Sequence, residues 1–129
     1  QKIYDNASAQ LQSPAFSTQG LIKKMNVRVI CTTDDPIDDL SHHQAIKESE
    51  FSTKVLPAFR PDKAIEISSA VHFNIYLSKL EKASKIPISS FDDYLYALQN
   101  RHDFFASMGC TVSDHGLEQI LMYRHHCGW

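Results

Sequence analysis

The stretch VRVICTTDDP (Val27 to Pro36) is a short β-branched, apolar run that ends in two aspartates and a proline. Valine, isoleucine and threonine favour a buried strand over residues 27–32, and the acidic turn that follows ends it. Two further stretches predict the same arrangement: TKVLP (Thr53 to Pro57) and the shorter CTVS (Cys110 to Ser113). We therefore expect three short strands, each followed by polar or charged residues.

Helical segments separate these strands. Ser17 is a suitable N-cap for a short helix, Ser90 for a longer one, and Gly109 stands where a left-handed residue often ends a helix. Alternation of strands and helices favours an α/β fold with a parallel sheet and right-handed crossovers. We expect helices over residues 1–12, 16–25, 37–47, 66–83 and 90–108, and another that begins near residue 117. The apolar face of the helix after Ser90 predicts core positions at Phe91, Tyr94, Leu98 and Phe105.

Composition excludes several classes of protein. The chain has 129 residues, with 13 basic and 15 acidic side chains and 43% hydrophobic residues, as in ordinary globular domains. No basic surplus indicates a nucleic-acid partner, and no long apolar run indicates a membrane span or a secretory signal. Three cysteines without CxxC spacing argue against a disulfide framework. We expect a cytoplasmic protein with neither nucleic acid nor membrane as partner.

Charged residues follow all three predicted strands. In parallel α/β folds the carboxyl ends of neighbouring strands meet at one edge of the sheet, where chemistry collects. Three charged strand ends together predict a functional site at that edge. The candidate residues are Asp34 and Asp35 after the first strand, Arg60 and Asp62 after the second, and Asp114 and His115 after the third.

These strand ends also have purely structural interpretations. Asp34 or Asp35 can cap the helix that follows by accepting backbone N–H bonds, or can lie near a metal or a sugar hydroxyl. Arg60, held extended before Pro61, can bind a substrate carboxylate through two parallel hydrogen bonds, or can form an ion pair with Asp62 or another acidic residue of a loop. The residues themselves leave both interpretations open.

Three histidine-containing stretches have residue types that also occur in hydrolytic or metal sites. Ser113, Asp114 and His115 are the residue types of a hydrolytic triad, but neighbours on a strand point to opposite faces, which excludes triad geometry. His115 can carry a proton, lie beside a metal or donate to a substrate, or it can be a buried, satisfied histidine. The stretches His42-His43 and His125-His126-Cys127 lack the spacing of a zinc site.

The strand-end stretches also resemble a known family. CTTDDPIDDLSHHQAI (residues 31–46), KVLPAFRPDKA (54–64) and RHDFFASMGCTVSDHGL (101–117) closely resemble the uronate isomerases, also called glucuronate isomerases, with GLIKKMNVRVI (20–30) as the lead-in. The similarity extends to about residue 121, in the order and spacing of the family. Phe59 stands where many relatives carry tryptophan, and residues 122–129 depart from the family pattern.

This resemblance implies a fold and a reaction. The family belongs to the amidohydrolase superfamily, folds as a (β/α)₈ TIM barrel, and interconverts D-glucuronate with D-fructuronate and D-galacturonate with D-tagaturonate. A barrel of this type needs about 250 residues. We therefore expect residues 1–129 to be one internal fragment of the barrel, with strands resembling its second to fourth, and to be inactive alone. The resemblance implies these roles: substrate binding by Arg60, Asp34, Asp35 and Asp62, and catalysis by Asp114 and His115.

The resemblance also implies a cofactor and partners. Members bind a divalent metal, often zinc, through an HxH pair after the first barrel strand and an aspartate after the last. This sequence has no HxH pair, so we expect the metal ligands outside this chain. The expected partner is a hexuronate sugar, and the complete enzyme could form a homo-oligomer. Two alternatives are a fragment of a metal-dependent hydrolase of the same superfamily and, less favoured, a receiver-like signalling module.

Overall fold

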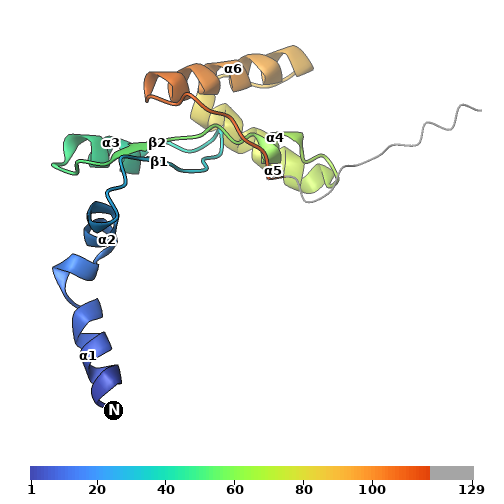
Figure 1. Ribbon diagram of the computed structural model, residues 1–129. Helices are drawn as coiled ribbons and strands as arrows, with labels where there is room; N and C mark the ends of the chain where they lie inside the picture. The colour runs from blue at the N-terminus through green and yellow to red at the C-terminus, as the bar shows by residue number, and fades with distance from the viewer. Residues whose placement is uncertain (117–129) are drawn as a thin grey trace, which may run out of the picture.

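The computed structural model describes residues 1–116, in which helices alternate with two short strands (Figure 1). The elements in chain order are α1 (Lys2–Leu11), a 3₁₀ helix (Pro14–Phe16), α2 (Thr18–Lys24), β1 (Val29–Cys31), α3 (Ser41–Glu48), β2 (Lys54–Leu56), α4 (Asp62–Ile65), α5 (Ala70–Ser84) and α6 (Phe91–Ser107). The expected helix near residue 117 and residues 122–129, which we expected to depart from the family pattern, lie outside the described residues.

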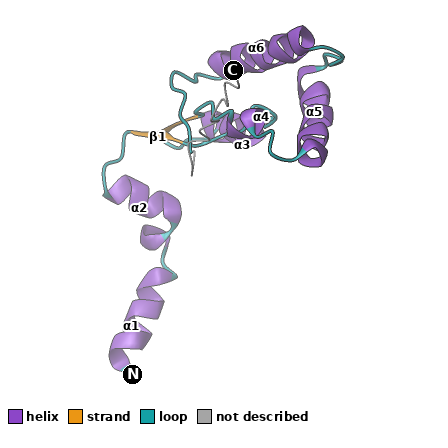
Figure 2. Ribbon diagram, turned by 90° about the vertical axis from the view of Figure 1, so that its right-hand side faces the viewer, coloured by secondary structure: helices purple, strands orange, loops and turns teal. Residues whose placement is uncertain are grey.

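Helices α1 and α2 extend away from the rest of the chain in both views (Figures 1 and 2). The side chain of Ser17 accepts a hydrogen bond from the backbone N–H of Gly20 at 3.1 Å, which confirms Ser17 as the N-cap of α2. Gly20 also permits a close approach, because a Cβ there would lie 2.3 Å from the carbonyl oxygen of Pro14. The bend between the two helices therefore depends on a residue without a side chain.

Strands β1 and β2 pair in parallel, as the sequence predicted. Val29 lies opposite Lys54, and Cys31 lies opposite Leu56. Both strands are shorter than the predicted ranges. Strand β2 ends directly before Pro57, which has no N–H to donate to a neighbouring strand.

The prediction of a third strand over residues 110–113 is wrong, because the structure forms no strand there. The chain there makes one isolated parallel bridge, between Phe59 and Ser113. Gly109 has φ +97°, and the N–H of Cys110 still donates to the carbonyl oxygen of Phe105 at 3.0 Å. The first residues of this stretch are thus tied to the end of α6, and only its last residues reach the segment after β2. The predicted parallel direction is nevertheless correct.

Two helix boundaries also differ from those predicted. Helix α3 begins at Ser41 rather than near residue 37, because Leu40 adopts a left-handed conformation with φ +56°. Asp39 accepts a hydrogen bond from the N–H of Ser41 at 2.9 Å, so it precedes the helix instead of lying in its first turn. Helix α5 begins at Ala70, after the short helix α4 in a region where we expected a loop.

The core lies between α4, α5 and α6. Leu80 and Ala97 are fully buried there, and Tyr76 and Tyr94 are nearly so. Phe105, also fully buried, packs instead with Leu40 and Phe59 in a second cluster. Phe91, predicted as core, is 71% exposed, which corrects that expectation. The physical reason is the direction of the buried stripe of α6, which consists of Tyr94, Ala97, Arg101 and Phe105 and excludes Phe91.

No described helix is both long and apolar enough to cross a membrane. Cys31 and Cys110 are free thiols. Cys127 lies outside the described residues.

Candidate functional site

Backbone hydrogen bonds bring the three predicted strand ends together. The N–H of Asp34 donates to the carbonyl oxygen of Ala58 at 3.0 Å, and the N–H of Arg60 donates to that of Asp34 at 2.9 Å. On the other side, the N–H of Phe59 donates to the carbonyl oxygen of Val112 at 3.1 Å. The segment after β2 therefore lies between the other two, and their charged side chains share one edge.

Arg60 and Asp114 form a two-point ion pair at this edge. The Nε–H of Arg60 donates to Oδ1 of Asp114 at 3.1 Å, and its Nη2 donates to Oδ2 of the same carboxylate. These hydrogen bonds hold the pKa of Asp114 below its usual range and raise the pKa of Arg60. The ion-pair interpretation of Arg60 is thus realised mainly with Asp114, while Asp62 lies 3.9 Å from Nε.

Asp62 binds the segment that carries His115. Its Oδ2 accepts the N–H of Gly116 at 2.7 Å, and its Oδ1 lies 2.8 Å from Nδ1 of His115. The N–H of Gly116 is the main cause of a lowered pKa for Asp62, with His115 and Arg60 adding to it. A carboxylate kept ionised can only accept, so Nδ1 of His115 is the donor and Nε2 faces away from this contact. Half of the His115 side chain is exposed, which rules out the buried, satisfied interpretation.

Asp35 lies against α4 and α5. Its Oδ1 accepts hydrogen bonds from the hydroxyl of Tyr76 and the N–H of Ile37, both at 3.1 Å. Its Oδ2 lies 3.3 Å from Nζ of Lys63. Burial, followed by the charge of Asp35, raises the pKa of the Tyr76 hydroxyl, which therefore stays a donor. Asp35 thus closes a turn before α3 but does not cap that helix, whose N-cap is Leu40, and it also binds two side chains that arrive from other elements.

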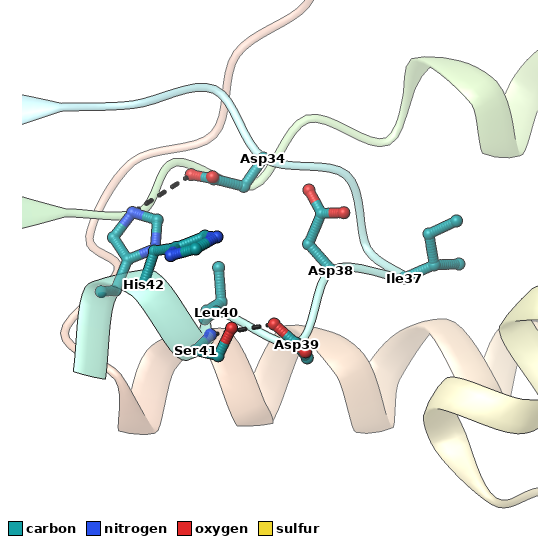
Figure 3. Close-up of a pocket in the computed structure, with 8 residues that line it drawn as sticks. Asp34, Ile37, Asp38, Asp39, Leu40, Ser41 and His42 are labelled. Carbon is teal, nitrogen blue, oxygen red and sulfur yellow. Dashed lines mark hydrogen bonds and ion pairs between the residues drawn. The ribbon is translucent and has the colours of Figure 1, made fainter. Parts of the chain in front are cut away.

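Asp34 belongs to a hydrogen-bonded group with Thr32 and His43. The hydroxyl of Thr32 lies 2.6 Å from Oδ2 of Asp34 and 2.8 Å from Nε2 of His43. The N–H of Ala58 donates to the same Oδ2 at 3.3 Å. Figure 3 shows Asp34 directing its carboxylate toward the imidazoles at the start of α3, while Asp39 faces Ser41.

Arg101 is a residue of this region that the sequence analysis missed. From α6 it donates to the carbonyl oxygens of Pro36 at 2.7 Å, Asp38 at 2.8 Å and Ala83 at 3.1 Å. It is 7% exposed and packs on the ring of Phe104. An arginine four residues from Ala97 and four from Phe105 lies on the buried face of the helix, and that spacing was the available signal. Arg101 thereby holds the acidic loop of residues 33–39.

A cavity of about 340 Å³ lies between the acidic loop and the segment after β2. Asp34, Asp35 and Asp38 line one side, and Arg60 and Asp62 the other. Among residues 1–116, no group of three or more histidine, cysteine, aspartate or glutamate side chains is placed to hold a metal ion. The described part of the chain therefore does not fit a metal centre, and the stretch at residues 125–127 lies outside it.

Two parallel strands with helices between them, and charged residues around a cavity at their carboxyl ends, define this chain as part of an α/β fold with a candidate site at one edge of its sheet. Comparison with known proteins gives the family. The sequence profile described as "Glucuronate isomerase" matches residues 1–127, so the chain belongs to the glucuronate isomerase family. This finding confirms the resemblance and favours it over the hydrolase and receiver-like alternatives.

Individual relatives agree with this assignment. The chain is 46% identical over 119 residues to uronate isomerase from Bacteroides thetaiotaomicron and 47% identical over 122 residues to that from Lachnospira eligens. These alignments cover 92% and 94% of the chain but 25% and 26% of the relatives. The chain thus spans about a quarter of the length of the curated relatives it matches.

Solved structures of the family show the same local fold. The crystal structure of glucuronate isomerase from Caulobacter crescentus matches with a TM-score of 0.78 at 32% identity, over 86% of this chain and 23% of that one. Uronate isomerase from Thermotoga maritima matches with a TM-score of 0.71 at 36% identity, over 75% of this chain and 21% of that one. The two described strands and their helices therefore correspond to part of the fold of these enzymes.

Proposed function

We propose that this chain supplies substrate-binding and proton-transfer groups of a uronate isomerase. The reaction is the aldose–ketose isomerisation of hexuronates, D-glucuronate to D-fructuronate and D-galacturonate to D-tagaturonate. It moves a proton between C2 and C1 through an enediol-like intermediate, and so needs an acid/base group and stabilisation of charge on oxygen. The observation that supports these roles is the meeting of Arg60, Asp62, Asp114 and His115 at one edge.

Arg60 binds the hexuronate carboxylate in this proposal. The Nε–H group of Arg60 and one N–H of its Nη2 donate to Asp114, and these two hydrogen bonds fix the plane of the guanidinium. The second N–H of Nη2 and both N–H groups of Nη1 remain as donors. A guanidinium oriented in this way offers a planar pair of donors to a second carboxylate. Asp34, Asp35 and Asp62, on the walls of the same cavity, are placed to accept hydrogen bonds from sugar hydroxyls.

His115 is the proton carrier in this proposal. Because Nδ1 donates to Asp62, the neutral ring presents its lone pair at Nε2, where it can accept a proton from the sugar and return it. Asp62 orients the ring and stabilises the imidazolium that forms, as carboxylates do for catalytic histidines elsewhere. Asp114, also predicted as catalytic, is kept ionised by Arg60, which makes it a weak base. We propose that Asp114 contributes by fixing Arg60.

None of the roles proposed above for this chain's residues involves the family's divalent metal. The described residues offer no cluster for it, and each step above concerns only this chain's own side chains. That the ligands lie elsewhere in a complete enzyme stays a prediction.

A segment exchange tests the proposed function. The matching quarter of the Bacteroides thetaiotaomicron uronate isomerase is replaced by this chain, and conversion of D-glucuronate and D-galacturonate is measured beside lactone and amide hydrolysis. We expect isomerisation of the uronates without hydrolysis. A folded, soluble exchange protein that does not isomerise either uronate would contradict the proposal, as would hydrolysis of a lactone or amide in its place.

A further inference from the structure

We propose that His43 is a positioning residue, which acts through Thr32 to hold the carboxylate of Asp34 toward the sugar-binding cavity. Nothing in the sequence pattern assigned a role to His43, which was weighed only as a zinc ligand. The role of Asp34 toward a sugar rests on the proposed function above. The hydrogen-bonded arrangement that orients Asp34 does not rest on it.

The three side chains are enclosed together. His43 comes from α3, Thr32 follows β1, and Asp34 lies two residues further on. The side chain of His43 is 11% exposed and that of Asp34 is 13% exposed. Nε2 of His43 lies 3.8 Å from Oδ2 of Asp34, too far for a hydrogen bond, and the Thr32 hydroxyl bridges the two at 2.8 and 2.6 Å.

Counting protons fixes the direction of these hydrogen bonds. The Thr32 hydroxyl has one proton, and its shortest acceptor is the carboxylate of Asp34, which has none to give. The hydroxyl oxygen must then accept from His43, so Nε2 of His43 carries a proton. The chain of donors runs from Nε2–H of His43 to the hydroxyl of Thr32 and from that hydroxyl to Oδ2 of Asp34. A leucine at position 43 would leave the Thr32 oxygen without this donor.

Asp34 links this arrangement to the proposed substrate site. Its Oδ2 is held by Thr32 and by the N–H of Ala58, while among the described residues no hydrogen bond reaches its Oδ1. Its backbone carbonyl accepts the N–H of Arg60 at 2.9 Å. Asp34 also lines both the cavity beside α3, about 490 Å³, and the cavity shared with Arg60. Fixing Oδ2 from the α3 side therefore leaves Oδ1 as the free acceptor of a carboxylate that lines both cavities.

Ring nitrogen chemical shifts test the arrangement directly. In the full chain carrying ¹⁵N-histidine, we expect the His43 signals, assigned through His43→Gln, to show a protonated Nε2 and an unprotonated Nδ1 in the neutral ring. Thr32→Val should change the Nε2 shift, and Thr32→Ser should restore it. A ring protonated at Nδ1, or one indifferent to Thr32→Val, would overturn the proposal whether or not the chain takes part in isomerisation.

A double-mutant cycle in the exchange protein tests the effect on function. We expect His43→Leu to lower kcat/KM for D-glucuronate about tenfold, and His43→Gln, which keeps a donor, to recover most of it. Because His43 acts through Asp34, His43→Leu should cost little more in an Asp34→Asn background. Equal losses in both backgrounds would show that His43 acts independently and would overturn the proposal. Thr32→Val in both backgrounds gives the same comparison if His43→Leu does not fold.

Discussion

Asp62 accepts a hydrogen bond from Nδ1 of His115 at 2.8 Å, although 53 residues separate the two in the sequence. The contact joins α4, directly after the second strand end, to the segment after α6. It exists because the parallel bridge from Phe59 to Ser113 brings these segments into register. One carboxylate thereby fixes both the tautomer and the direction of an exposed imidazole.

Loss of this pair should slow proton transfer more than substrate binding. In the exchange protein we expect His115→Gln to lower kcat about a hundredfold or more, since general acid–base catalysis contributes at least that much. Asp62→Asn should have a smaller effect, about tenfold, because an amide oxygen can still accept from Nδ1 but carries no charge to stabilise the imidazolium. Steady-state kinetics with D-glucuronate separate kcat from KM.

His72 provides the matched control for that experiment. Its side chain is exposed and makes no hydrogen bond or ion pair among residues 1–116. His72→Gln should therefore leave kcat unchanged. A kcat for His115→Gln within twofold of that for His72→Gln would remove His115 from the proton-transfer step.

Arg60 should not tolerate lysine. Lysine has a single ammonium group, which cannot bind Asp114 at two points and also present a planar pair of donors to a substrate. We expect Arg60→Lys to lower kcat/KM for hexuronates about tenfold to a hundredfold, the effect of losing charged hydrogen bonds. The control is Arg28→Lys, because Arg28 is exposed and its side chain makes no ion pair in the described part of the chain. Similar kinetics for both variants would argue against carboxylate binding by Arg60.

Local chemistry made much of the fold predictable. Ser17 and Ser90 cap their helices, and Ser90 completes a reciprocal capping box with Asp93. The β-branched runs form the two parallel strands. These features depend on neighbouring residues, so the sequence reveals them without knowledge of the tertiary structure.

Features set by distant contacts were harder to predict. Residues 110–113 have strand-like composition, but the hydrogen bond from Cys110 to the end of α6 prevents a full strand. The candidate site residues were found from their places at strand ends. The ion pair of Arg60 with Asp62 was also predicted, whereas its two-point contact with Asp114 and the contact of His115 with Asp62 were not. Arg101 was missed because its spacing places it on the buried face of α6 but does not show what it binds there, and only the contact with the distant acidic loop explains a buried charge.

Arg101 should be essential for the stability of the acidic loop. Its guanidinium satisfies three backbone carbonyl oxygens in a nearly buried position, and lysine can satisfy only part of that set. We expect Arg101→Lys to lower the free energy of unfolding by about 3–6 kcal/mol, the effect of losing two hydrogen bonds to a charged group. Denaturant titrations of this variant and of Arg28→Lys make the comparison. Equal midpoints would show that the loop does not depend on Arg101.

Stability should fall in acid through the carboxylates that hold residues 113–116. The pKa of Asp114 is lowered by Arg60, and that of Asp62 chiefly by the N–H of Gly116, from an ordinary value of 3.8. A folded-state pKa below the unfolded one means that the unfolded chain binds more protons, so this contribution is complete above pH 3.8 and is lost as pH falls below it. Thermal midpoints measured between about pH 6 and pH 3 should show this decline.

Two variants test its origin. Asp114→Asn should flatten the decline and Asp5→Asn should not, because Asp5 lies on the separate helix α1. A decline as steep in Asp114→Asn as in the parent chain would assign the acid sensitivity to other carboxylates.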